Sequence, residues 1–102
     1  MIESNFNLEK QLEYPKSGIF SKVLVKLDNK DATLFCMSKG SELSEHTSTK
    51  EGFVFVLEGE GLFVLSGKKI KMKKNVLIHM KKNEKHSLKA IKNTSFLLIL
   101  SK

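Results

Sequence analysis

The sequence is poor in several residue types, and each shortage excludes a class of protein. Its 102 residues include no arginine, no tryptophan and only one each of cysteine, proline and tyrosine. The single Cys36 excludes the intrachain disulfide framework of many small secreted domains. The longest unbroken apolar runs, 53–57 and 96–100, are five residues long, against the roughly 20 that a membrane-spanning helix needs. We therefore expect no membrane-spanning segment.

The marks of a secretion signal are also missing. Residues 1–10 have neither an apolar core segment nor a small-residue cleavage site, which together define a signal peptide. With the lone cysteine, this pattern predicts a protein of the reducing cytoplasm. A chain of this length can bury one hydrophobic core, so we expect a single compact domain.

All of the positive charge comes from lysine. The formal net charge is +7, and residues 68–92 hold ten lysines against one acid, Glu84. Such a basic segment is the usual electrostatic mark of nucleic-acid binding. However, bidentate contacts to bases and planar stacking are made by arginine, not by lysine. We therefore expect no sequence-specific nucleic-acid binding and interpret the segment as a lysine-rich, solvated sheet face.

Short stretches of apolar and β-branched residues predict an all-β fold. Gly, Asn and Ser separate them at roughly ten-residue spacing, and no helix of normal length is visible, which is typical of a sandwich or barrel and most simply of a jelly roll. The predicted strands are 19–27, 33–37, 53–57, 62–65, 69–73, 76–80, 86–91 and 96–100.

We divide the chain into an N-terminal arm, residues 1–17, and one barrel domain, residues 18–102. Tyr14-Pro15 favours an extended conformation in the arm. Such an arm can lie across its own barrel, or it can be exchanged and extend a sheet edge of a partner chain. Both arrangements remain open at the level of sequence.

Two segments resemble the two motifs of the cupin superfamily. Gly-Ser-Glu-Leu-Ser-Glu-His at 40–46, followed by Phe-Val-Phe-Val-Leu-Glu-Gly-Glu-Gly at 53–61, is similar to the first motif. Asn-Val-Leu-Ile-His-Met-Lys-Lys-Asn-Glu-Lys-His at 75–86 is similar to the second. The resemblance covers about residues 19–100. It implies a small single-domain cupin of the conserved-barrel (cupin 2) type, a double-stranded β-helix with one polar pocket that typically forms a homodimer.

The resemblance also bears on metal binding. Cupins commonly hold a metal with a His-x-His pair, a following Glu or Gln, and the histidine of the second motif. His46 and His86 match this pattern, whereas Ser48 replaces the second histidine and the carboxylate position falls on or beside Gly52. Two matched ligands are fewer than catalytic zinc or non-haem iron sites use. The pattern therefore disfavours a bound divalent transition metal without excluding it, and it indicates no particular cofactor.

Glu51 and His79 are weaker candidates for completing a metal site with the two matched histidines. Glu51 lies one position before the expected carboxylate, so its side chain is expected on the other face of the strand. His79 lies in a run too short to fix its direction, and a sheet interface or solvent is its favoured surrounding.

His86 is the best candidate for an inward-pointing polar group. The alternation in 86–91 places its side chain on the apolar face of that strand. Because a buried imidazole needs a hydrogen-bond partner, His86 is either a core residue bonded to Ser48, Thr47 or the backbone, or part of a binding site. With the resemblance, we predict a small-molecule pocket formed by His46, Ser48 and His86.

Three functions remain open. The favoured one is a protein whose interior pocket binds a small molecule, with no assignable reaction and no catalytic residue. The second is a metal-dependent cupin enzyme of the dioxygenase or isomerase type, with His46, His86 and either Glu51 or His79 as an atypical ligand set. The third is a sensory or regulatory module that acts through a partner. The fold alone does not choose among them.

Overall fold

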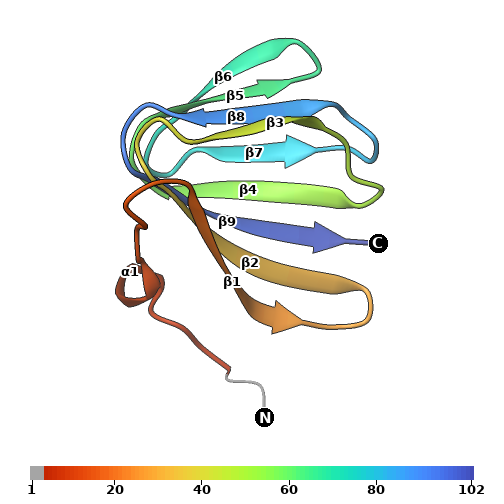
Figure 1. The fold of residues 1–102 in the computed structure, drawn as a ribbon. Helices are drawn as coiled ribbons and strands as arrows, with labels where there is room; N and C mark the ends of the chain where they lie inside the picture. Colours follow the sequence, from red (N-terminus) through yellow and green to blue (C-terminus); the bar gives the residue numbers. More distant parts are fainter. Residues whose placement is uncertain (1–3) are drawn as a thin grey trace.

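The computed structural model describes residues 4–102, and it confirms the all-β prediction (Figure 1). One helical turn, α1 (Leu8–Gln11), precedes the strands. The strands of the described residues are β1 (Ile19–Lys26), β2 (Lys30–Met37), β3 (Glu42–His46), β4 (Glu51–Glu58), β5 (Gly61–Leu65), β6 (Lys68–Met72), β7 (Leu77–Met80), β8 (His86–Ala90) and β9 (Thr94–Ser101).

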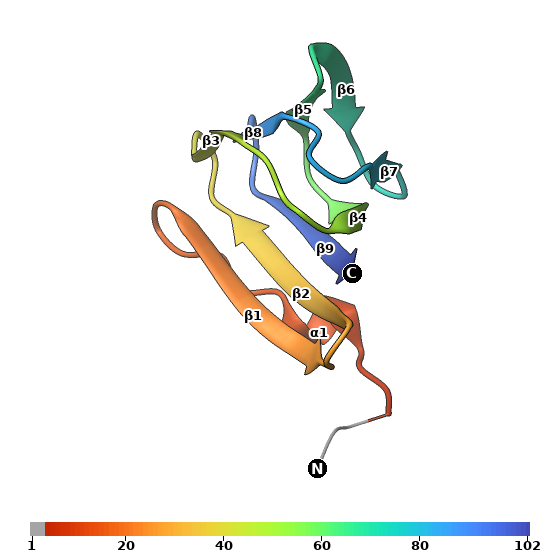
Figure 2. The same ribbon diagram turned by 90° about the vertical axis from the view of Figure 1, so that its right-hand side faces the viewer.

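The strands form two antiparallel sheets that face each other (Figure 2). One sheet has the order β1-β2-β9-β4-β7, and the other has the order β3-β8-β5-β6. From β3 onward the chain crosses repeatedly between the two sheets, which is the jelly-roll topology of a double-stranded β-helix. The predicted fold class is therefore confirmed.

The hydrophobic core lies between the sheets and is built by strand alternation. Along β4, for example, Gly52, Val54 and Val56 are buried while the residues between them are more exposed. The same rule orients β8, where His86, Leu88 and Ala90 are buried as the sequence indicated. The clustered buried residues are Met37, Val54, Val56, Phe63, Met72, Ile78, Met80, Leu88, Ala90 and Phe96.

Two details differ from the predicted strands. No strand is predicted at 42–46, but this segment forms β3, an edge strand whose residues are mostly exposed. The predicted strand 19–27 corresponds to β1, whose register with β2 shifts between Val23 and Val25. Val23 and Leu27 are 57% and 48% exposed.

The N-terminal arm, in the part that the structure describes, lies against its own five-stranded sheet, on the side away from the four-stranded sheet (Figure 2). The Tyr14 hydroxyl donates to Glu58 Oε2 at 2.7 Å, and Lys22 Nζ donates to Gln11 Oε1 at 2.7 Å. Leu34 and Cys36 alternate with the inward residues of β2, so their side chains lie on the outer face of the sheet. Both are nevertheless fully buried. Part of the outer sheet face is therefore covered by the arm.

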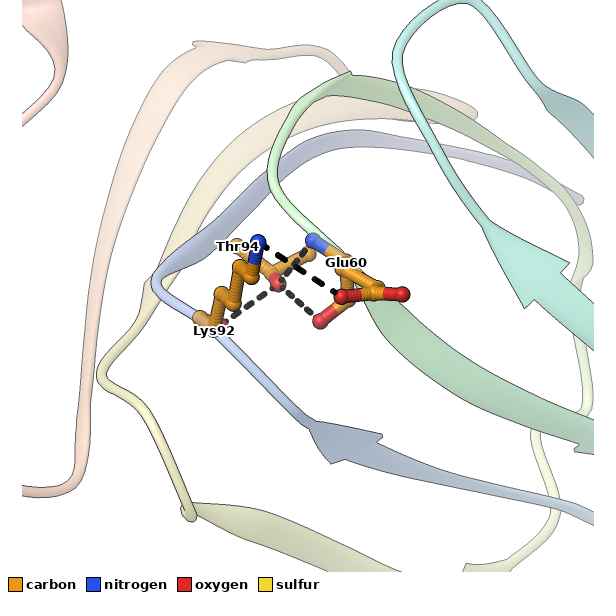
Figure 3. A network of polar contacts seen from close by, with 3 residues as sticks. All are labelled: Glu60, Lys92 and Thr94. Carbon is orange, nitrogen blue, oxygen red and sulfur yellow. Dashed lines mark hydrogen bonds and ion pairs between the residues drawn. The ribbon is translucent and has the colours of Figure 1, made fainter.

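A polar network joins the β4–β5 turn to the β8–β9 turn (Figure 3). The Thr94 hydroxyl accepts from the Glu60 backbone N–H at 3.1 Å, and its own proton lies within reach of the carbonyls of Glu60 and Lys92. The Lys92 Nζ and Glu60 Oε2 atoms are 3.9 Å apart. Because Thr94 is fully buried, the bonds of its hydroxyl hold the two turns together away from water, whereas the ion pair is exposed.

Helices long and apolar enough to cross a bilayer are absent from residues 4–102.

Candidate functional site

A small cavity lies between the two sheets, next to the ends of β3 and β8. It encloses about 60 Å³ and has mostly apolar walls. Its lining residues are Phe35, Leu43, His46, Val54, Phe63, Met80, His86, Leu88, Phe96 and Leu98. An apolar cavity with a few convergent polar groups is the usual form of a small-molecule site.

His46 and His86 are the polar groups of this cavity. They end β3 and begin β8, and their Cα atoms are partners in the register of the two strands. Their ring centroids are 4.1 Å apart at an interplanar angle of 64°, an edge-to-face contact. The Phe63 ring stacks nearly parallel to that of His86, with centroids 5.9 Å apart. His86 is buried while His46 is exposed, so His46 lies at the rim of the cavity.

Backbone carbonyls fix the tautomer of both rings. Nδ1 of His46 donates to the Ser44 carbonyl at 2.7 Å, and Nδ1 of His86 donates to the Glu84 carbonyl at 3.1 Å. These bonds assign the proton of each neutral ring to Nδ1. The Nε2 atom of each ring therefore carries a lone pair. In residues 4–102 no hydrogen bond uses either Nε2.

Burial lowers the pKa of His86 below its ordinary value. The Glu84 carbonyl acts in the opposite direction, and the charge that His46 can carry lowers the pKa of His86 further. His86 is therefore neutral at pH 7, and its Nε2 is a hydrogen-bond acceptor.

Ser48, the third predicted pocket residue, is placed outside the cavity lining. Its hydroxyl accepts from the Lys50 backbone N–H at 3.1 Å, within the same turn. Its carbonyl accepts from the Asn83 backbone N–H at 2.7 Å. Ser48 thus links the β3–β4 turn to the β7–β8 turn, which leads into His86.

Glu51 and His79 lie together on the outer face of the five-stranded sheet. Nε2 of His79 and Oε2 of Glu51 are 2.6 Å apart, and the His79 ring stacks on Phe53 at 4.8 Å. Both side chains are about half exposed, and neither lines the cavity. The structure therefore brings Glu51 to His79 and neither of them to His46 or His86.

The sequence matches the family model of the cupin domain over residues 33–101. The chain belongs to the cupin family. This agrees with the motifs in the sequence and with the jelly-roll topology. No curated protein gives a significant match to this cupin.

Several solved structures superpose closely on this one. A cupin 2 conserved barrel domain protein from Leptotrichia buccalis is 35% identical with a TM-score of 0.88, over 95% of this chain and 47% of that one. A cupin superfamily protein from Desulfitobacterium hafniense is 19% identical with a TM-score of 0.88, over 97% and 91% of the two chains. A protein of unknown function from Streptococcus pyogenes is 22% identical with a TM-score of 0.87, over 97% and 87%.

The residues of this cupin do not fit a three-ligand metal site. At the position where the family pattern expects a carboxylate, Gly52 is buried, and a Cβ built there would lie 2.7 Å from a Leu100 methyl and 3.0 Å from the Met80 methyl. Apolar side chains thus fill the space of that ligand. Among the described residues, no group of three or more His, Cys, Asp or Glu side chains could hold a metal ion.

Glu84 is a site residue that sequence reasoning missed. Its carboxylate accepts from the Lys81 backbone N–H at 2.8 Å and from the Ser66 hydroxyl at 2.9 Å, and these bonds lower its pKa. Its carbonyl orients His86. The adjacent Asn83 has φ +67°, the left-handed conformation that Asn tolerates well. In the sequence, the turn-forming Asn83 followed by Glu84 just before the inward His86 was the signal that could have indicated this role.

Proposed function

We propose that this cupin binds a small molecule between its sheets, with His46 and His86 as the polar anchors. The observation that carries the proposal is the arrangement of the two imidazoles: edge to face at 4.1 Å, with both Nδ1 atoms bonded to carbonyls and, within residues 4–102, no partner for either Nε2 atom. His46 is exposed and Nε2 of His86 is not fully buried, so a ligand entering the cavity can reach both acceptors.

The two rings favour a ligand that donates hydrogen bonds. A neutral imidazole with its proton on Nδ1 offers only an acceptor at Nε2, so a hydroxyl, an N–H group or a protonated acid is its complement. The other walls are aliphatic or aromatic, apart from the Met80 thioether. With about 60 Å³ inside, the cavity admits only a small apolar part of the ligand, and its donor group binds beside His46 at the rim.

No reaction follows from this site. A neutral imidazole can act as a general base, but neither ring has a carboxylate partner in the cavity lining, and the apolar walls do not indicate which bond of a ligand would react. The carboxylates of Glu51 and Glu84 are used in bonds outside the cavity. Binding is therefore the function we propose.

Ligand retention by purified protein tests the proposal. Chain purified without chelator is denatured, and released small molecules are identified by mass spectrometry. We expect one compound with a hydrogen-bond donor in the parent, and its loss from both His46→Ala and His86→Ala. His79→Ala serves as the matched control, because it removes an imidazole from the opposite face of the sheet, and it should retain the compound.

Elemental analysis of the same samples separates the metalloenzyme alternative. We expect well under one equivalent of Zn, Ni, Mn or Fe in the parent, because the Gly52 and Ser48 positions supply no ligand to the cavity. A near-equimolar metal that disappears in both His46→Ala and His86→Ala would contradict the proposal.

A further inference from the structure

A second open site lies at the seam between the two sheets, where β6 and β7 are edge strands. Among the strands of residues 4–102, β6 pairs only with β5, and β7 pairs only with β4. An open groove of about 520 Å³ lies along both strands. It is lined by Leu65, Lys68, Lys69, Ile70, Lys71, Leu77, Ile78 and His79. None of its residues lines the cavity between the sheets.

The register shows which backbone groups of β6 face the groove. Ser66 and Gly67, at φ +48° and +83°, form the two-residue turn between β5 and β6. In such a hairpin the flanking residues exchange backbone hydrogen bonds, and every second residue repeats this pattern. Leu65 and Lys68 are therefore a bonded pair. The N–H and C=O groups of Lys69 and Lys71 then point away from β5, toward the open edge.

The same reasoning applies to β7. The Val56 backbone N–H donates to the Val76 carbonyl at 2.9 Å, which begins the bonded pairs between β4 and β7. Alternation continues these pairs at Ile78 with Val54 and leaves the backbone groups of Leu77 and His79 facing outward. Both strands thus present unpaired backbone along one groove.

The side chains along the groove determine which kind of ligand can bind there. Lys69 and Lys71 are exposed on one face of β6, whereas Ile70, between them, packs against the core. Lys68, Lys69 and Lys71 make no ion pair with any residue in 4–102. A strand added beside β6 would place alternate side chains next to lysine and next to isoleucine.

We propose that this groove binds an extended acidic segment of another protein, which adds to the β6 edge as a strand. Its acidic residues alternate with apolar ones, so that carboxylates meet Lys69 and Lys71 while apolar side chains meet Ile70. Lysines on an edge strand repel a second copy of the same edge, and they attract a strand of opposite charge. The groove is therefore closed to self-association and open to an acidic partner.

Fluorescence anisotropy with a labelled peptide tests this proposal. The probe is a capped eight-residue peptide of alternating Glu and Val, about 26 Å long at the usual rise of a strand. We expect saturable binding that Lys69→Glu/Lys71→Glu weakens by about tenfold or more, because two attractive pairs become repulsive. Lys69→Gln/Lys71→Gln should weaken binding less. Circular dichroism checks the fold of both variants.

A matched control makes the same change in net charge at a site far from the groove. Lys26→Glu/Lys30→Glu lies on the β1–β2 hairpin, at the opposite end of the molecule from β6 (Figure 1), and both lysines are exposed. We expect this variant to bind the peptide with an affinity within about twofold of the parent, because salt screens charges that lie far from the groove. Equal weakening in this control and in the β6 variant would overturn the proposal, since it would show general attraction to a basic protein.

Two further probes distinguish strand addition from other binding to lysine. A peptide N-methylated at alternate residues keeps its charges but loses the backbone donors of one edge, so we expect it not to bind. Equal binding of that peptide would overturn the proposal. Single-stranded RNA and phosphatidylserine vesicles are the second probe, at physiological salt. The proposal would also be overturned if either of them bound more tightly than the peptide and lost that binding in Lys69→Glu/Lys71→Glu.

Discussion

His86 illustrates how one side chain depends on both strand alternation and local turn chemistry. Its inward direction was predictable, because His86 shares its side of the strand with Leu88 and Ala90, whereas Lys89 lies on the other side. Its hydrogen-bond partner was not, since the choice among Ser48, Thr47 and backbone depends on how two turns fold against each other. The structure bonds it to the Glu84 carbonyl and leaves Ser48 in a turn of its own.

The burial of His86 predicts how stability depends on pH. Its pKa is lower in the folded chain than the ordinary value of about 6.5, so between these two values the unfolded chain binds more protons. The stability contribution is therefore fully present above about pH 6.5 and falls as pH decreases toward the folded pKa. Thermal unfolding of the parent from pH 7.5 to pH 5 should show this decline.

The variant His86→Phe should flatten that decline, because it keeps an aromatic ring against Phe63 and has no group to titrate. Leu88→Val, at the next inward position of β8, is the control for general destabilisation and should keep the slope of the parent. An unchanged slope in His86→Phe would show that another group causes the pH dependence.

At the scale of elements, the hydrophobic pattern located five strands well. β6 and β8 fall close to the predicted ranges because apolar and polar residues alternate along them, whereas β4, β5 and β9 do so because each contains a continuous apolar run. β3 was missed because it is an edge strand with Leu43 as its single apolar residue. The bulge in β1 was also invisible, since a register shift depends on the pairing with β2 and leaves no mark in composition.

The turn between β4 and β5 predicts an unusually large cost for one small substitution. Gly59 has φ +107°, and a Cβ there would lie 2.3 Å from the Asn93 carbonyl and 2.5 Å from the Thr94 Cα. Gly67→Ala, with φ +83° and open space around it, should cost only the conformational strain of roughly 1–2 kcal/mol. Gly59→Ala should cost about 2 kcal/mol more than that, because backbone must move.

Urea unfolding of the two glycine variants measures the difference. Similar losses of unfolding free energy for Gly59→Ala and Gly67→Ala would mean that the β8–β9 turn moves freely, contrary to the network in Figure 3.

The Thr94 hydroxyl predicts a local effect in the same network. Thr94→Val keeps the shape of the side chain but leaves the partly buried Glu60 backbone N–H without its acceptor, at a cost of about 1 kcal/mol. Thr94→Ser keeps the hydroxyl. Hydrogen exchange of the Glu60 amide should therefore accelerate in Thr94→Val and change little in Thr94→Ser. Equal exchange in both variants would exclude the hydroxyl as the group that protects this amide.

At the scale of the whole molecule, we propose that the cupin forms a homodimer through the outer face of its five-stranded sheet. Phe53, Ile99 and Leu77 are 39%, 37% and 61% exposed on that face, next to the part that the arm covers. Phe53 is the register partner of Ile99, so their side chains form one apolar patch. Self-complementary patches of this kind favour a two-fold symmetric contact.

Light scattering tests this assembly. We expect about twice the chain mass of 11.6 kDa at micromolar concentration, and a monomer for Phe53→Lys/Ile99→Lys, which places charge in the contact. Ser21→Lys/Lys22→Ser, on the exposed part of β1, is a control that should remain dimeric. A parent mass of 11.6 kDa across the micromolar range would contradict the proposal.

The central claim is that His46 and His86 hold a small molecule without a metal, and a crystal structure of protein purified without chelator tests it most directly. The account predicts density for an organic ligand within hydrogen-bond distance of both Nε2 atoms, with no anomalous signal between the rings. An anomalous peak bonded to both Nε2 atoms and to a third protein ligand would contradict it.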